Sequence, residues 1–134
     1  MEMAIVLPLL LLVVFGIIQF GLGWWLSEVI TNGAREGARY GVVVADPPIP
    51  DYCCTAPPSV EERVQNYLNN SGVDASLATI TVGYTNAGVA VTYDTCKSGC
   101  EVNVSVSVPV RNLIPAFFPL FPNDLTARAV MRHE

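Results

Sequence analysis

The sequence predicts an α+β fold, in which a long N-terminal hydrophobic α-helix precedes a small antiparallel β-sheet head with a short helix. Three observations indicate this fold. No charged residue occurs from Met3 to Ser27, and no proline interrupts Glu28 through Ala45. From Glu101 to Val110, valine alternates with mostly polar residues, as in a half-buried antiparallel strand. We therefore divide the 134 residues into a helix over 1–45 and a head over 46–134.

Composition disfavours several classes of function. The net charge is −5 and no basic cluster is present, which argues against nucleic-acid binding because that requires lysines and arginines on phosphates. The single histidine, His133, is next to the C-terminus, so a Ser-His-acid triad has no support. The chain has no phosphate-binding motif and no acidic spacing typical of a calcium loop. We expect no enzyme activity and no cofactor.

The apolar run is long enough to cross a membrane. It exceeds the roughly 18–20 residues that a membrane helix needs, and Trp24 and Trp25 stand at its end, where interfacial aromatic residues occur. A cleaved signal peptide is the alternative, but the acidic Glu2, the length of the run and the missing cleavage site disfavour it. A helix over residues 2–45 would be about 65 Å long, about twice what a membrane requires.

Small residues line the second half of this helix. Gly33, Gly37 and Gly41 are spaced four residues apart and share one face. Each glycine costs roughly 1 kcal/mol in helix propensity, so a close approach by another element is expected to offset the cost. That element is either the chain's own head or another subunit, and both contacts are compatible with the pattern.

The first half of the helix contains a proline and three glycines. Pro8 lacks an amide hydrogen and is expected to loosen or bend the helix around residues 4–8. Gly16, Gly21 and Gly23 would permit close crossing of helices. Glycines that are merely tolerated in a membrane span give the same pattern.

The head begins with a proline-rich loop over Asp46–Pro58. The sequence Ser59-Val60-Glu61-Glu62 is a capping box for a helix over Val60–Asn70, with Gly72 as its stop. The valine face of the sheet is expected to be covered by the glycine-lined helix. Strands are expected over Ala78–Gly83, Val89–Tyr93, Glu101–Val110 and Leu125–Arg132, with a turn at Tyr84–Gly88 and an apolar loop at Leu113–Pro122.

Four cysteines, Cys53, Cys54, Cys96 and Cys100, lie in the head. An even count in a short extracytoplasmic domain indicates two disulfides. Because a bond between adjacent cysteines strains the peptide, we expect Cys53 and Cys54 each to pair with Cys96 or Cys100. A zinc site with four thiolates is the alternative, and the adjacent pair fits tetrahedral ligation poorly.

Three segments resemble TadE-like proteins, which are pilin-like subunits of the tight-adherence class of type IV pilus. The chain opens with EMAIVLPLLLL over Glu2–Leu12, followed by FGIIQFG over Phe15–Gly21. NGAREGARYG over Asn32–Gly41 and ARAVMR over Ala127–Arg132 are also similar to that family. A long helix half embedded in a small α+β head is likewise the outline of a pilin.

The resemblance implies a subunit made as an inner-membrane precursor and trimmed by a prepilin peptidase. The pilus assembly machinery would then assemble it into an extracellular homopolymeric filament for adhesion. Outside the membrane, the apolar side chains would be shielded by other subunits. Glu2 would pair with the N-terminal ammonium of Met1 of an adjacent subunit, or else lie at the membrane surface. The alternatives are a minor pseudopilin that primes or tips the pilus, and a single-span membrane protein with an extracytoplasmic binding or signalling head.

The charge flanking the span gives a conflicting signal. Arg35 and Arg39 follow the span, so the positive-inside rule by itself would place the head in the cytoplasm. The cysteines and the resemblance place the head outside. Family members carry a short basic leader before the glutamate, whereas here Glu2 follows Met1 directly. We expect the upstream codons to encode such a leader, or the sequence to be that of the processed chain.

Overall fold

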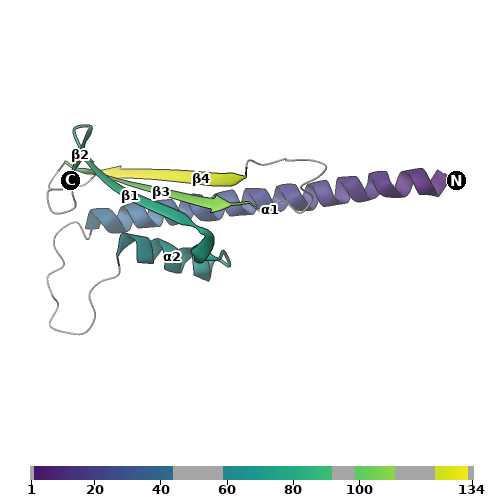
Figure 1. Cartoon of the computed structure of the whole chain (residues 1–134), viewed down its shortest axis with the longest axis horizontal. Helices are drawn as coiled ribbons and strands as arrows, with labels where there is room; N and C mark the ends of the chain where they lie inside the picture. Colours follow the sequence, from purple (N-terminus) through teal and green to yellow (C-terminus); the bar gives the residue numbers. More distant parts are fainter. Residues whose placement is uncertain (1, 44–58, 92–98, 111–122, 133–134) are drawn as a thin grey trace.

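The computed structural model describes residues 2–43, 59–91, 99–110 and 123–132. It confirms the predicted α+β architecture, a long helix followed by a short helix and a small antiparallel sheet (Figure 1). The elements in chain order are α1 (Glu2–Val43), α2 (Val60–Asn70), the 3₁₀ turn η1 (Ala75–Leu77), β1 (Thr79–Asn86), β2 (Val89–Val91), β3 (Glu101–Pro109) and β4 (Asp124–Arg132).

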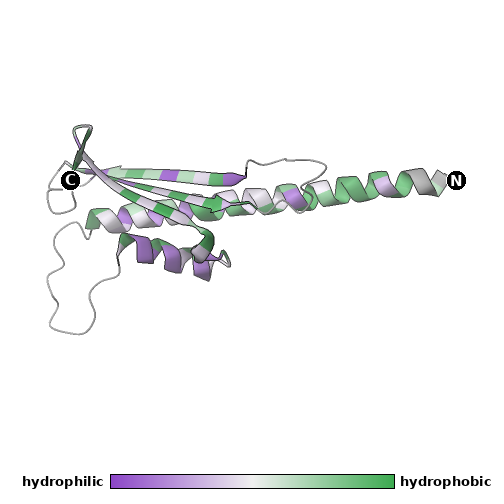
Figure 2. Ribbon diagram, viewed as in Figure 1, coloured by the Kyte–Doolittle hydropathy of each residue, from purple (hydrophilic) through white to green (hydrophobic). Residues whose placement is uncertain are grey.

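Helix α1 is a single rod of 42 residues, about 63 Å long at 1.5 Å per residue. It continues through Pro8, so the proline does not end the helix. One half of the rod extends away from the head and the other half lies along it (Figure 1). The extended half is almost uniformly apolar (Figure 2).

Helix α2 has the predicted bounds and the predicted N-terminal cap. The Ser59 hydroxyl accepts a hydrogen bond from the Glu62 amide at 3.1 Å, which satisfies one of the free amides of the first turn. The helix ends before Gly72, whose φ of 83° is the left-handed conformation that glycine adopts without cost. The short turn η1 follows and was not predicted. Its cap is the Asp74 carboxylate, which accepts a hydrogen bond from the Ser76 amide at 3.0 Å.

The four strands form one antiparallel sheet in the order β2-β1-β3-β4. The predicted turn at Tyr84–Gly88 is wrong, because Tyr84, Thr85 and Asn86 continue β1 and pair with β2. The turn consists of Ala87 and Gly88, with φ of 50° and 82°. Positive φ at both central residues matches the right-handed twist of the strands in a tight hairpin.

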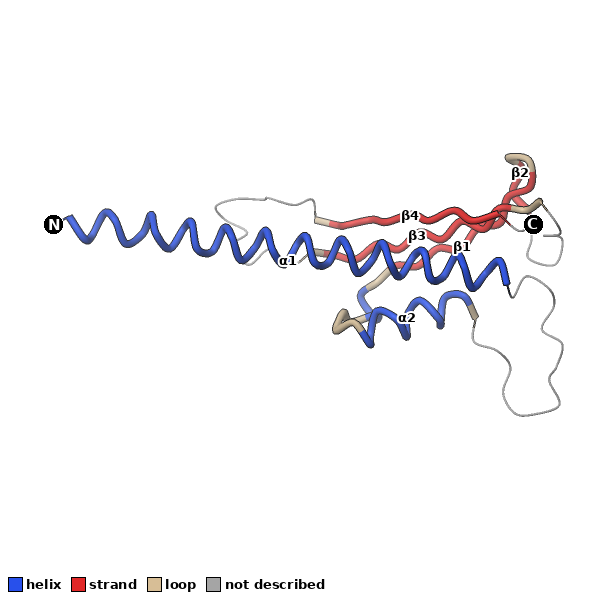
Figure 3. Tube along the Cα trace, turned by 180° about the vertical axis from the view of Figure 1, so that it is seen from behind, coloured by secondary structure: helices blue, strands red, loops and turns tan. Residues whose placement is uncertain are grey.

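Helix α1 covers one face of the sheet, with α2 beside it (Figure 3). The alternating valines of β3 point toward α1 and are buried: Val102, Val104, Val106 and Val108. The opposite face is polar. There the Asn103 amide donates to Thr85 Oγ1 at 3.1 Å, and its Oδ1 accepts from Arg128 at 2.8 Å. The half-buried pattern predicted for this strand is therefore confirmed.

Candidate functional site

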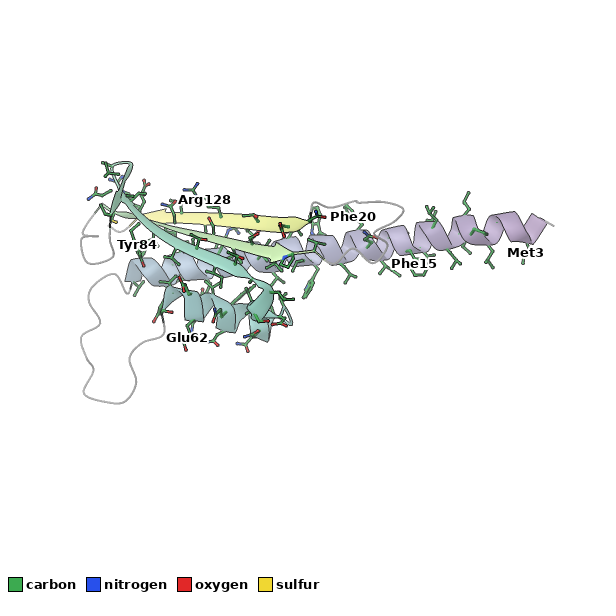
Figure 4. The ribbon with its side chains drawn as sticks, in the orientation of Figure 1. Met3, Phe15, Phe20, Glu62, Tyr84 and Arg128 are labelled. Atoms are coloured by element: carbon green, nitrogen blue, oxygen red, sulfur yellow. The ribbon has the colours of Figure 1, made fainter. Side chains whose placement is uncertain are left out.

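The most unusual surface in the described chain is the N-terminal half of α1. Its large apolar side chains are exposed all round the helix; Leu9 is 66% and Ile17 68% accessible. Met3 and Phe15 lie on the part of α1 that extends beyond the described strands, and Phe20 lies near the start of β4 (Figure 4). We call this surface the apolar shaft: Met3, Val6, Leu7, Leu9, Leu10, Leu11, Leu12, Val13, Val14, Phe15, Ile17, Ile18, Phe20, Leu22, Trp24 and Trp25.

The second half of α1 has the opposite character on the face toward the head. Ile30 is 1% exposed, and Ala34 and Ala38 are fully buried. These residues form one core with the β3 valines and with Val64 and Leu68 of α2. The same helix thus has one half held by the chain's own head and one half that the described residues leave largely uncovered.

Aromatic residues mark the transition between the two halves. The rings of Phe20 and Trp24 lie 6.2 Å apart between centroids, and both side chains are exposed, as is Trp25. On the same stretch of helix, Gln19 is only 6% exposed. An exposed apolar helix that ends in aromatic residues is typical of a segment that meets a membrane interface there. By length and composition, α1 is able to cross a membrane.

The predicted glycines fall into two groups. Around Gly16 and Gly21, no side chain of the described residues lies within 4 Å of where a Cβ would be, which is compatible with a close approach by another helix. Gly23 is buried. The expected packing of Gly16, Gly21 and Gly23 between subunits stays a prediction.

The other group, Gly33, Gly37 and Gly41, faces the chain's own head. A Cβ on Gly33 would lie 3.3 Å from Tyr67 Cδ1, and one on Gly41 would lie 2.9 Å from Val102 Cγ1. At Gly37 the crowding atom is Val64 Cγ2. Of the two contacts that the sequence allowed, the structure supplies the one within the chain, and the expected contact between subunits through these three glycines stays a prediction.

Helix α1 begins at Glu2, whereas Met1 lies outside the described residues. The expected pairing of Glu2 with Met1 of another subunit therefore stays a prediction. Pro8 lies in the exposed part of the shaft.

Of the four cysteines, Cys100 lies in the described part of the chain. Its side chain is fully buried, and its sulfur takes part in a disulfide. Cys53, Cys54 and Cys96 lie outside the described residues. The expected pairing of Cys53 and Cys54 with Cys96 and Cys100 stays a prediction. Among the described residues, no group of three or more His, Cys, Asp or Glu side chains is placed to hold a metal ion.

One polar contact between the helices was not predicted. Arg63 of α2 forms an ion pair with Glu36 of α1 at 3.0 Å and lies over the ring of Tyr40, 5.8 Å from its centroid. Arg63 and Glu36 are 27 residues apart in sequence, and no local spacing rule links them. Only the packing of α2 on α1 brings them together.

The comparisons with known proteins agree with the resemblance predicted from the sequence. The family model described as TadE-like protein matches residues 1–39. This match covers the shaft and most of the helix that packs on the head. No curated protein and no solved structure matches the chain.

Proposed function

We propose that this chain is a structural pilin subunit that polymerises through the apolar shaft into an extracellular Tad-like type IV pilus, where it serves adhesion. The observation that supports the proposal most directly is the division of α1. One half is buried against the head, and the other half presents an apolar surface that the described residues leave open. The match of residues 1–39 to TadE-like proteins points in the same direction.

The shaft needs a different apolar partner in each environment. In the inner membrane, lipid tails surround it, and apolar helices gain little by associating there. Outside the membrane, exposing these side chains to water costs on the order of tens of kcal/mol per chain, at about 1.5–3 kcal/mol for each large apolar residue. A bundle of shafts with the heads outside removes this cost. Transfer from lipid to bundle requires work, which we assign to the pilus assembly machinery.

Glu2 sets the axial position of neighbouring shafts in this proposal. A carboxylate within an apolar bundle is costly unless a cation pairs with it. The N-terminal ammonium of Met1 from an adjacent subunit is the cation that the proposal supplies. Prepilin peptidase would free this ammonium from the leader.

The test is to shear filaments from the native cell, image them by electron microscopy and immunoblot them for this chain. The proposal predicts abundant chain in the filaments, and at least about a tenfold loss for Glu2→Gln, because a buried charge left without its partner is strongly destabilising. Glu101→Gln, which removes an exposed carboxylate from β3, is the matched control and should assemble normally.

The other results have defined meanings. Trace amounts of the chain in filaments would indicate a minor pseudopilin. Complete absence from filaments, with the chain retained in the membrane, would indicate a single-span membrane protein and would overturn the proposal. Normal assembly of Glu2→Gln would overturn the pairing with Met1.

A further inference from the structure

A charged ridge runs along the back of α1, on the side opposite the head. Glu28, Asn32, Arg35 and Arg39 are all exposed, and their spacing of three or four residues places them on one face of the helix. The ridge changes sign along its length, from Glu28 near the shaft to Arg35 and Arg39 further on. Glu28 and Arg35 are separated by about 10 Å along the helix axis.

The two arginines of the ridge have no acidic partner in the described part of the chain. The ion pair found there joins Arg63 to Glu36 and includes neither Arg35 nor Arg39. Glu36 lies on the side of α1 that faces α2, whereas the two arginines lie on the back. The ridge therefore carries two cations that form no ion pair with the described residues.

Two carboxylates of α2 likewise form no ion pair with the described residues. Glu61 and Glu62 are exposed in the first turn of the helix, and Glu62 lies on the side of α2 away from α1 (Figure 4). The arginine next in sequence, Arg63, is engaged with Glu36. The outer side of α2 thus presents an acidic patch, Glu61 and Glu62.

The acidic patch and the basic end of the ridge lie at the same height along the molecule. Val60, the neighbour of Glu61, packs beside Gly41 and Gly37, where added Cβ atoms would lie 3.4 Å and 3.7 Å from its methyl groups. Arg39 lies between these two glycines in sequence, and Arg35 lies one helical turn nearer to the shaft. Two copies with parallel shafts bring the patch to the height of the arginines at an axial offset between zero and about 6 Å, the rise from Arg35 to Arg39.

We propose that Arg35 and Arg39 of one copy bind Glu61 and Glu62 of a neighbouring copy that points in the same direction. The inference rests on the proposed function, because that function supplies the parallel neighbour. Charge complementarity identifies a second copy as the occupant of each patch. A larger offset would move the acidic patch toward Glu28, which repels it, so the ridge selects one register.

The two patches occupy different parts of the molecular surface, and this determines the kind of assembly. A contact between unlike patches is heterologous, and it continues from copy to copy as an open helix when the rotation does not close. Each copy then uses its ridge toward one neighbour and its α2 patch toward another. A self-complementary contact would instead stop at a dimer.

The test is charge reversal, read as the amount of chain in sheared filaments relative to the chain in the cell. Arg35→Glu/Arg39→Glu should lower the assembled amount about tenfold, since exposed ion pairs are individually weak but reversal replaces attraction by repulsion at two sites. Glu61→Arg/Glu62→Arg should do the same. The quadruple variant that combines them should recover assembly to within about twofold of wild type.

The matched control is Arg128→Glu/Arg132→Glu, which makes the same change in net charge at two exposed arginines of β4. It should assemble as wild type does. Thermal unfolding in detergent checks that each head is folded, and a photo-cross-linker at position 39 should capture a peptide of α2 from another copy. Filament breakage should increase with salt, because exposed charges are screened.

The possible failures are distinguishable. If the wild-type chain is absent from filaments, the proposed function and this inference fall together. If the wild type assembles and Arg35→Glu/Arg39→Glu assembles equally well, this inference alone is overturned. It is also overturned if folded double variants lose assembly and the quadruple variant does not recover it.

Discussion

Gly37 of α1 lies directly against Val64 of α2, and no space for a methyl group remains between them. On the other side, a Cβ on Gly37 would be 3.3 Å from Val104 Cγ1 of β3. One glycine thus allows the long helix to approach both the short helix and the sheet. The stability of the head depends on this approach.

Substituting Gly37 by valine should therefore destabilise the head. Overpacking of a filled core costs about 1–3 kcal/mol, and the methyl groups of Val64 and Val104 are held by their own helix and strand. Thermal unfolding of the purified chain in detergent, followed by circular dichroism, measures the loss. Gly21→Val is the control, because no atom of the described residues lies within 4 Å of a Cβ there. Equal Tm values for the two variants would contradict the packing described.

The disulfide at Cys100 should contribute to stability and reveal its partner. Removal of a native disulfide from a small domain costs about 2–5 kcal/mol, so Cys100→Ser should lower the unfolding free energy by that amount. Peptide mapping without reductant should recover Cys100 linked to Cys53 or Cys54. Recovery of Cys100 linked to Cys96 would refute the predicted pairing.

The ion pair between Glu36 and Arg63 should be measurable but small. Both side chains are partly exposed, and such pairs contribute about 0.2–1 kcal/mol. A double-mutant cycle with Glu36→Gln and Arg63→Gln should give a coupling free energy in that range, and 1 M salt should reduce it. A coupling that does not change with salt would contradict an exposed ion pair as its source.

The depth of the aromatic residues in a membrane can be measured directly. Trp24 and Trp25 are the two tryptophans of the chain, so intrinsic fluorescence reports the end of the shaft without a label. In lipid vesicles, a quencher near the headgroups should quench more strongly than one at the acyl-chain ends, because tryptophan prefers the interface. Stronger quenching from the bilayer centre would show that the span is displaced toward the head.

Local signals were sufficient to predict most of the regular elements. The absence of proline between Pro8 and Pro47 predicted one long helix, and Ser59 with Glu62 predicted the start of α2. The alternating valines predicted β3 and the face that α1 covers. In each case, the residues that define the element also make its hydrogen bonds or its buried face.

Other features depend on tertiary structure and carried no local signal. Alanine has no preference for positive φ, so Ala87 gave no indication that the β1–β2 turn was so short. The contact of Arg63 with Glu36 and the common height of Arg39 and Glu61 follow from how α2 packs on α1. The glycine stripe was compatible with two partners, and only the position of the head distinguishes them.

Because α1 runs from the shaft into the core of the head without a break, the helix itself forms no joint between these two parts. The head cannot swivel on a tether. A rotation or a force applied at one end of α1 is therefore transmitted along the helix to the other end. The contacts made by the first twenty or so residues therefore determine the direction in which the polar face of the sheet points.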